Sequence, residues 1–179
     1  HIYSDCLPFK EGLAAVKLGE KVGYIDTNGI LTIPAVFTQA RSFSYGVARV
    51  ISPQTEQLQG GGYIDKSGRP CIDFNSLEKK YGSIELPYNF FDPFKSNGQI
   101  SSMTLGMMDY GGPYESPEDF AQGLLPVTLG KGQGYIDTTG KVVIEPQFDK
   151  AESFSDGIAK VTINDKIGYI DKTSKLIIA

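Results

Sequence analysis

The chain has 179 residues, enough for one ordinary domain or a short array of smaller units. Its 17 basic and 21 acidic side chains give a net charge of −4, which argues against a nucleic-acid partner or an anionic membrane surface. No apolar run approaches the roughly 20 residues that span a bilayer, so we expect no membrane-spanning segment.

The first predicted element is a repeated unit that begins at Phe9. From there the sequence reads F-K-E-G-L-A-A-V, then K-V-G-Y-I-D-T-N-G and I-L-T-I-P-A-V-F, and the same order returns from Phe120. A further copy follows each, at Phe43 and at Phe154, and both steps measure 34 residues. This recurrence predicts tandem units that each form one supersecondary structure.

Each unit is predicted to form three antiparallel strands. The first strand carries apolar pairs at positions i and i+2, which share one face of a strand: Ala14/Val16, Ala48/Val50, Leu125/Val127 and Ala159/Val161. The second strand of each unit is Gly-Tyr-Ile-Asp, in which the tyrosine and the isoleucine point to opposite faces. The repeated tyrosines are Tyr24, Tyr63, Tyr135 and Tyr169. The third strand follows a turn and contains an isoleucine at a fixed distance from that turn: Ile33, Ile72, Ile144 and Ile178.

The turn before the third strand places Asp first and Gly fourth, as in Asp26-Thr27-Asn28-Gly29. A type I β-turn favours this pattern, because the carboxylate accepts from nearby N–H groups and Gly tolerates positive φ. We therefore assign the repeated Asp residues to turn structure rather than to calcium binding, which needs several oxygens from one loop. In the last unit Ser174 replaces the glycine, so we expect that hairpin to be the most strained or frayed.

The segment between the well-matched units departs from the pattern. We interpret residues 76–119 as a degenerate middle repeat, because Gly106–Gly112 is similar to a worn Gly-Tyr-Ile-Asp element. Short helices are predicted over residues 76–82 and from Ser116, which has Pro at the next position. The loops 38–44 and 149–155 are predicted to hold a single 3₁₀ turn.

These elements predict an all-β chain in which tandem three-stranded meanders of about 34 residues form one repeat domain. A single meander cannot bury its apolar face alone, so neighbouring units must stack. We expect a solenoid-like row, with a small propeller-like closed ring as the alternative. The expected units are residues 9–42, 43–75, 76–119, 120–153 and 154–179.

The repeated string resembles the WG-repeat (KWG-repeat) family, whose units read roughly F-x-x-G-x-A-x-V, K-W-G-Y-I-D-x-x-G and x-x-V-I-x-P-x-F/Y. The resemblance covers residues 9–73 and 120–178, and it implies a β-rich repeat scaffold. The family is found mostly in bacterial proteins. The resemblance supplies no catalytic residues that could be assigned to this chain. The family's tryptophan is replaced here, by Val22, Gly61, Gln133 and Ile167.

Composition leaves little material for catalysis. The only histidine is His1, and the two cysteines, Cys6 and Cys71, lack metal-site spacing, so we expect no catalytic residues, no bound metal and no cofactor. The two thiols could pair or stay free, and the compartment is left open. An Asp/Glu-dependent hydrolase is the least favoured alternative.

The most distinctive patch is the aromatic segment around residues 81–114. Packing inside an irregular repeat is the first interpretation of this segment, and a recognition surface is the second. As candidate binding residues we take Tyr88, Phe91, Tyr110 and Tyr114. The favoured function is a non-catalytic module that binds a protein partner, with a basic partner suggested by the acidic balance. Binding of cell-surface glycans through the repeated tyrosines is the alternative.

Overall fold

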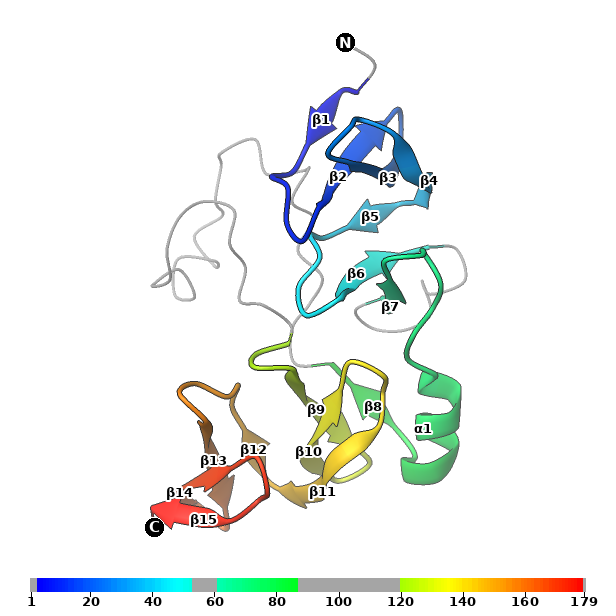
Figure 1. Cartoon of the computed structure of the whole chain (residues 1–179). Helices are drawn as coiled ribbons and strands as arrows, with labels where there is room; N and C mark the ends of the chain where they lie inside the picture. Colours follow the sequence, from blue (N-terminus) through cyan, green and yellow to red (C-terminus); the bar gives the residue numbers. More distant parts are fainter. Residues whose placement is uncertain (1–2, 53–60, 87–119, 179) are drawn as a thin grey trace, which may run out of the picture. The chain divides into compact units, whose positions relative to one another are not determined.

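The computed structural model describes residues 3–52, 61–86 and 120–178 and confirms the all-β class. Figure 1 shows short antiparallel strands that follow one another along the chain, with one short helix among the described residues. These residues divide into two compact units, one of residues 3–69 and one of residues 70–86 and 120–178. The aromatic candidates and the predicted elements at 106–112 and 116–119 lie outside the described residues.

The first unit holds two antiparallel sheets. The first sheet has the order β1-β2-β3-β4, and the second has the order β5-β6-β7. Their strands are β1 (Asp5–Cys6), β2 (Leu13–Leu18), β3 (Lys21–Asp26), β4 (Leu31–Phe37), β5 (Gln39–Ala40), β6 (Val47–Ile51) and β7 (Gly62–Asp65).

The second unit begins with α1 (Phe74–Tyr81) and then forms two antiparallel sheets. Their orders are β11-β10-β9-β8 and β12-β13-β14-β15. The strands are β8 (Ile84–Glu85), β9 (Leu124–Leu129), β10 (Gly132–Asp137), β11 (Val142–Phe148), β12 (Lys150–Ala151), β13 (Ile158–Ile163), β14 (Lys166–Asp171) and β15 (Leu176–Ile178).

The predicted three-stranded meander forms in the repeats that begin at Phe9, Phe120 and Phe154, but each sheet also gains a short edge strand. The loops 38–44 and 149–155 contain β5 and β12, so the predicted 3₁₀ turns were wrong. These short strands form because a hairpin with a two-residue turn follows each of them. Both turn residues have positive φ and the second is a glycine, as in the equivalent turn at Glu11 and Gly12. Such a turn matches the twist of paired strands and returns the chain antiparallel.

The second repeat departs from prediction after its turn, because no third strand forms around Ile72. Pro70 lacks the N–H that a strand ladder uses, and a helix begins soon after. Asp73 caps α1 by accepting from the Ser76 backbone N–H at 3.1 Å. The predicted helix over residues 76–82 is thus confirmed, with its first helical residue at Phe74.

The Asp-first turn is confirmed in all four repeats. In the first repeat the Asp26 carboxylate accepts from the backbone N–H groups of Asn28 and Ile30, both at 2.9 Å. In the last repeat Ser174 takes the glycine position with φ 68°, a conformation that L-residues adopt rarely. The strain predicted for that hairpin therefore lies at this serine.

The glycine before the tyrosine of the first repeat has a steric cause. Strand pairing slips between Val22 and Tyr24, so a β-bulge brings β4 close to β3. A Cβ on Gly23 would lie 2.6 Å from the Ile33 carbonyl oxygen and 2.8 Å from the Ala35 nitrogen. Only glycine fits where two backbones approach this closely.

Candidate functional site

The interface between consecutive repeats is built on one tyrosine and one phenylalanine. In the first unit the Tyr24 ring packs edge-on against Phe43 of the next repeat, with centroids 5.0 Å apart. The Tyr24 hydroxyl donates to the Arg41 carbonyl at 2.7 Å. The second unit repeats this arrangement, so the contact belongs to the repeat and not to one place in the chain.

In the second unit the rings of Tyr135 and Phe154 lie 4.8 Å apart, and the Tyr135 hydroxyl donates to the Glu152 carbonyl at 2.7 Å. Burial raises the pKa of both phenols, Tyr24 and Tyr135, above the ordinary value of 10.0. Both hydroxyls therefore stay protonated as donors over the physiological pH range. These tyrosines, together with Tyr63, are buried, so their rings pack inside the protein and are unavailable as a platform for sugars.

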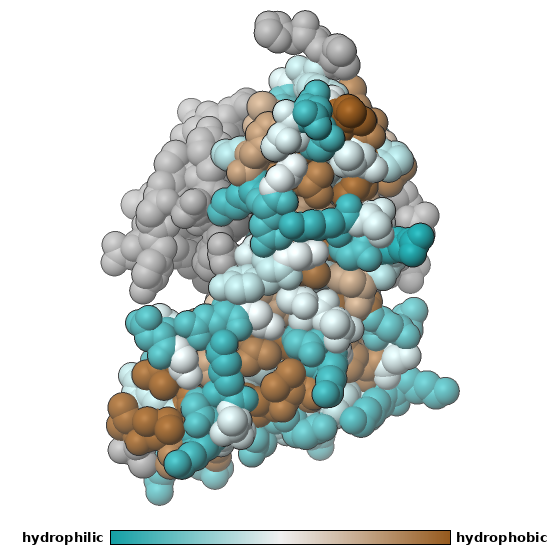
Figure 2. Space-filling view, viewed as in Figure 1, coloured by the Kyte–Doolittle hydropathy of each residue, from teal (hydrophilic) through white to brown (hydrophobic). Residues whose placement is uncertain are grey.

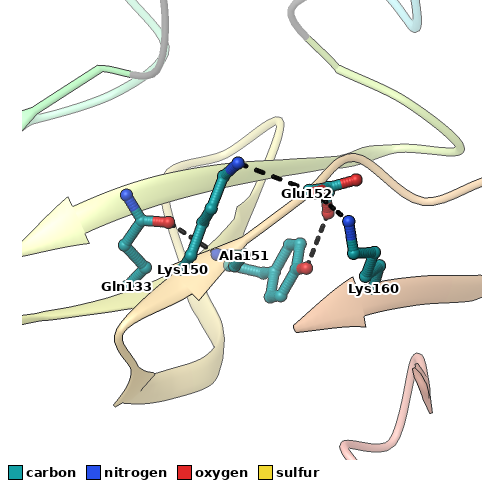
Figure 3. A network of polar contacts seen from close by, with 6 residues as sticks. Gln133, Lys150, Ala151, Glu152 and Lys160 are labelled. Atoms are coloured by element: carbon teal, nitrogen blue, oxygen red, sulfur yellow. Dashed lines mark hydrogen bonds and ion pairs between the residues drawn. The ribbon is translucent and has the colours of Figure 1, made fainter. Parts of the chain in front are cut away.

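Polar side chains surround the second of these contacts, as Figure 3 shows. The Gln133 amide oxygen accepts from the Ala151 backbone N–H at 2.6 Å. The Glu152 carboxylate pairs with Lys160 at 3.0 Å and with Lys150 at 3.7 Å. Gln133 stands where the family has tryptophan, and here it joins the fourth repeat to the chain that enters the fifth.

A second set of contacts joins the hairpin tips of neighbouring repeats. Glu11 accepts from the Gly46 N–H at 3.0 Å, and at the equivalent place Gln122 accepts from the Gly157 N–H at 3.1 Å. A lysine then reaches back from the later repeat, as when Lys172 donates to the Gln122 carbonyl at 2.9 Å. Both repeat interfaces in the described part of the chain therefore have the same polar clamp beside the aromatic contact.

Each repeat sheet has two different faces. We call the face that carries the repeat tyrosine the tyrosine face, and in the first repeat it includes Leu13, Ala15, Val22, Tyr24, Ile33 and Phe37. We call the opposite side the back face. In the first repeat it consists of Ala14, Val16 and Ile25. The equivalent residues are Ala48, Val50 and Ile64 in the second repeat and Ala159, Val161 and Ile170 in the fifth. In both buried cores the tyrosine face of one repeat packs on the back face of the next.

The back face of the first repeat forms a candidate binding groove. Ala14 and Val16 lie at its buried floor, Ile25 is half-buried, and segment 3–9 forms its wall. Its volume is about 690 Å³, in the range of ligand pockets. Among the described lining residues Asp5 is the one with a charged side chain.

Phe9 marks the same end of the array. Its equivalents Phe43 and Phe154 are 1% and 3% exposed because each packs on the tyrosine of the preceding repeat, whereas Phe9 is 50% exposed. Sequence analysis did not single out Phe9 or the groove. No local signal distinguishes Phe9, because its unit shares the pattern F-x-x-G-x-A-x-V with the units of Phe43 and Phe154.

The tyrosine face of the fifth repeat is also uncovered. Its residues are Ile158, Lys160, Thr162, Ile167, Tyr169 and Ile178. Ile167 and Ile178 are more than half exposed, and Figure 2 shows hydrophobic residues gathered at the lower left, where β14 and β15 lie. Exposed apolar side chains gathered beside Lys160 in this way form a candidate interaction surface.

The other predicted site features, the aromatic candidates and the two cysteines, do not form one site in the described part of the chain. Tyr88, Phe91, Tyr110 and Tyr114 lie outside the described residues, so that surface stays a prediction. Cys6 and Cys71 are free thiols, and Cys6 lines the groove. Across the described part of the chain no three His, Cys, Asp or Glu side chains cluster as metal ligands would.

The turn carboxylates serve the turns. Hydrogen bonds from Ile30 and Asn28 lower the pKa of Asp26, and bonds from Thr173 and Lys175 do the same for Asp171. For Asp137, burial raises the pKa, but the hydrogen bonds from Thr139 and Lys141 outweigh it. These carboxylates are therefore ionised acceptors inside their own hairpins.

Among the described residues, no helix combines the length and the apolar character needed to cross a membrane.

Comparison with known proteins gave one match. The family model described as a WG containing repeat matches residues 1–21, 23–51 and 134–166. No curated protein matches the chain, and no solved structure does. The matched segments lie in both of the stacked repeat pairs described above, and these segments match the WG-repeat family, with other residues in place of the repeat tryptophan.

Proposed function

We propose that the chain is a non-catalytic binding module that receives a protein partner in the groove of its first repeat. The observation that carries this proposal is the groove beside the back face of that repeat. In the second and fifth repeats the same face is covered by a preceding repeat, whereas in the first it lines a groove next to the half-exposed Phe9.

The chemistry of the groove favours a protein over a glycan. Its floor consists of hydrocarbon side chains, which suit aliphatic or aromatic residues of a partner. Its wall includes β1, the edge strand of its sheet, whose backbone could pair with an added strand. Sugars would instead need exposed ring faces, and Tyr24 and Tyr135 are buried.

The charge of the chain supports a partner with some basic character. The net charge is −4, and Asp5 lines the groove beside its apolar floor. A partner that combines an apolar side chain with a nearby Lys or Arg would match both features. Charge of this kind contributes more to association rate and specificity than to affinity.

The test is capture of partners from a native extract by the chain and three variants. Phe9→Asp places a charge at the groove mouth, and Val143→Asp is the control, because Val143 is an exposed β-branched residue in another repeat. A third variant with alanine at Tyr88, Phe91 and Tyr114 tests the aromatic segment instead.

The proposal expects loss of partner capture by Phe9→Asp and retention by Val143→Asp. Retained capture by a folded Phe9→Asp variant would contradict the groove as the binding site. Loss only in the triple-alanine variant would move the site to the aromatic segment, and a glycan array with a specific ligand would replace the protein partner.

A further inference from the structure

The turn between β3 and β4 differs from its three equivalents at one position. In the other turns the third residue carries a hydroxyl that donates to the carboxylate of the first, as Ser67 does to Asp65 at 2.6 Å. The equivalent donors in the fourth and fifth repeats are Thr139 and Thr173. In the first repeat the third residue is Asn28, whose side-chain amide donates to Asp26 at 3.4 Å. The first turn therefore carries an amide where the others carry a hydroxyl, and it holds that group by a longer bond.

The residue after Asn28 is a glycine. Asparagine is among the thermolabile residues, and a following glycine leaves its side chain open to attack by the backbone because glycine has no Cβ. No described atom lies within 4 Å of the place where a Cβ on Gly29 would stand. Asn28 and Gly29 are both exposed, so water reaches the pair. The bond that restrains the Gly29 N–H is its donation to the Asp26 carbonyl at 3.0 Å, which must open before the nitrogen can turn to the side chain.

The reaction open to this pair is an internal displacement of ammonia. The Gly29 backbone nitrogen gives its proton to solvent and forms a bond to the side-chain carbonyl carbon of Asn28. The bond from that carbon to the side-chain nitrogen breaks, and the nitrogen takes up a proton and leaves as ammonia. Water then opens the resulting five-membered imide at one of its two carbonyl carbons. The product at position 28 is an aspartate or an isoaspartate, according to which carbon the water attacks.

We propose that Asn28 and Gly29 form a deamidation site, and that its isoaspartyl product opens the turn between β3 and β4. This modification goes beyond the proposed function, because it needs no partner and lies in a turn. Asn28 is favoured over the two other asparagines of the described residues, since neither precedes a glycine. Asn75 lies inside α1 before a serine, and Asn164 precedes an aspartate.

The isoaspartyl product is incompatible with the hydrogen bonds of this turn. Its main chain runs through the former side-chain carbon, so the chain between Asp26 and Gly29 lengthens by one carbon atom. The Asp26 carbonyl accepts from Gly29 at 3.0 Å, and the Asp26 carboxylate accepts from the Ile30 N–H at 2.9 Å. Both bonds span the added carbon, so the present turn cannot keep them. Either product also adds a second carboxylate beside that of Asp26, and the two like charges repel.

Strand β4 depends on this turn because it is an edge strand. Among the described strands of its sheet it pairs with β3 alone. Its residues Ile33 and Phe37 belong to the buried core that the first repeat shares with the second, and the Phe37 ring lies 6.4 Å from that of Tyr24. Opening of the turn should therefore loosen β4 and its part of the contact with the second repeat.

The experiment ages the unchanged chain and one matched variant at physiological pH and temperature. Asn28→Ser removes the amide and supplies the hydroxyl that the second repeat uses. Peptide mapping by liquid chromatography and mass spectrometry separates the aspartyl and isoaspartyl forms, and hydrogen exchange measures amide protection in β4. The variant retains Asn97-Gly98, the other Asn-Gly pair of the sequence, and so controls for modification at that pair.

In the unchanged chain the peptide that contains Asn28 is expected to convert, mainly to isoaspartate, well before the peptides that contain Asn75 and Asn164. Protection in β4 is expected to fall in step with this conversion, while aged Asn28→Ser retains it. An Asn28 peptide that stays unmodified in the folded chain would overturn the site, whether or not it converts in urea. Conversion without loss of protection in β4, or an equal loss in aged Asn28→Ser, would overturn the effect on the turn.

Discussion

Truncation of Phe154 should destabilise the fifth repeat far more than truncation of Phe9 affects the first. The two residues occupy the same place in the repeat, but Phe154 is 3% exposed against Tyr135 and Phe9 is 50% exposed. Phe154→Ala removes a buried ring and leaves a cavity, which costs about 3–5 kcal/mol in well-packed cores. Phe9→Ala removes a ring whose burial contributes about half of the usual 1.5–3 kcal/mol, without a cavity.

Hydrogen exchange measured by mass spectrometry separates these outcomes. The fifth repeat contacts the fourth through this interface, and repeat arrays gain stability from nearest neighbours. We therefore expect Phe154→Ala to lower protection in β13 and β14 before the rest of the second unit opens. Phe9→Ala should leave protection of β2 and β3 close to that of the unchanged chain. Equal losses of protection in the two variants would contradict the reasoning that Phe154 is covered by its neighbour and Phe9 is not.

Three further predictions follow from individual contacts. Gly23→Ala places a Cβ 2.6 Å from the β4 backbone, so thermal unfolding should show that the free energy of unfolding falls by about 1–3 kcal/mol or more. An unchanged melting temperature would contradict the bulge geometry. The lowered pKa of Asp137 means that its carboxylate stabilises the fold above the ordinary pKa of 3.8 and that this contribution disappears as pH falls through the folded-state pKa. Asp137→Asn should therefore flatten the acid limb of a urea-unfolding series, and an unaltered limb would argue against this assignment. The raised pKa values of Tyr24 and Tyr135 mean that their protonated forms stabilise the fold fully below pH 10.0 and less as pH rises beyond it. Absorbance titration should show these two phenols ionising only when the chain unfolds, and reversible ionisation in the folded state would contradict their burial.

The sequence was sufficient to predict the strands with strong periodicity. Residues Ala14 and Val16 two positions apart, the Gly-Tyr-Ile-Asp string and the Asp-to-Gly turn each carry a local physical signal. The two-residue strands β5 and β12 lack one, because a strand of that length shows no alternation. They form because the hairpin closed by positive-φ residues aligns the chain with the next strand.

The missing strand of the second repeat shows how local signals can compete. Ile72 lies at the spacing of the other third-strand isoleucines, yet Pro70 precedes it and Asp73 caps a helix directly afterwards. Phe9 shows a different reason for failure. Its unit shares the pattern F-x-x-G-x-A-x-V with that of Phe43, so the local sequence does not indicate that Phe9 is 50% exposed.

The central claim is that repeats stack by placing the tyrosine of one repeat on the phenylalanine of the next. A double-mutant cycle tests it most directly, with Tyr135→Leu and Phe154→Leu measured singly and together by urea unfolding. We predict a coupling energy of about 0.5–1.5 kcal/mol for this pair, and additive effects for Phe154→Leu combined with Tyr24→Leu, which lies in the other unit. Additive effects for Tyr135 and Phe154 would contradict the claim.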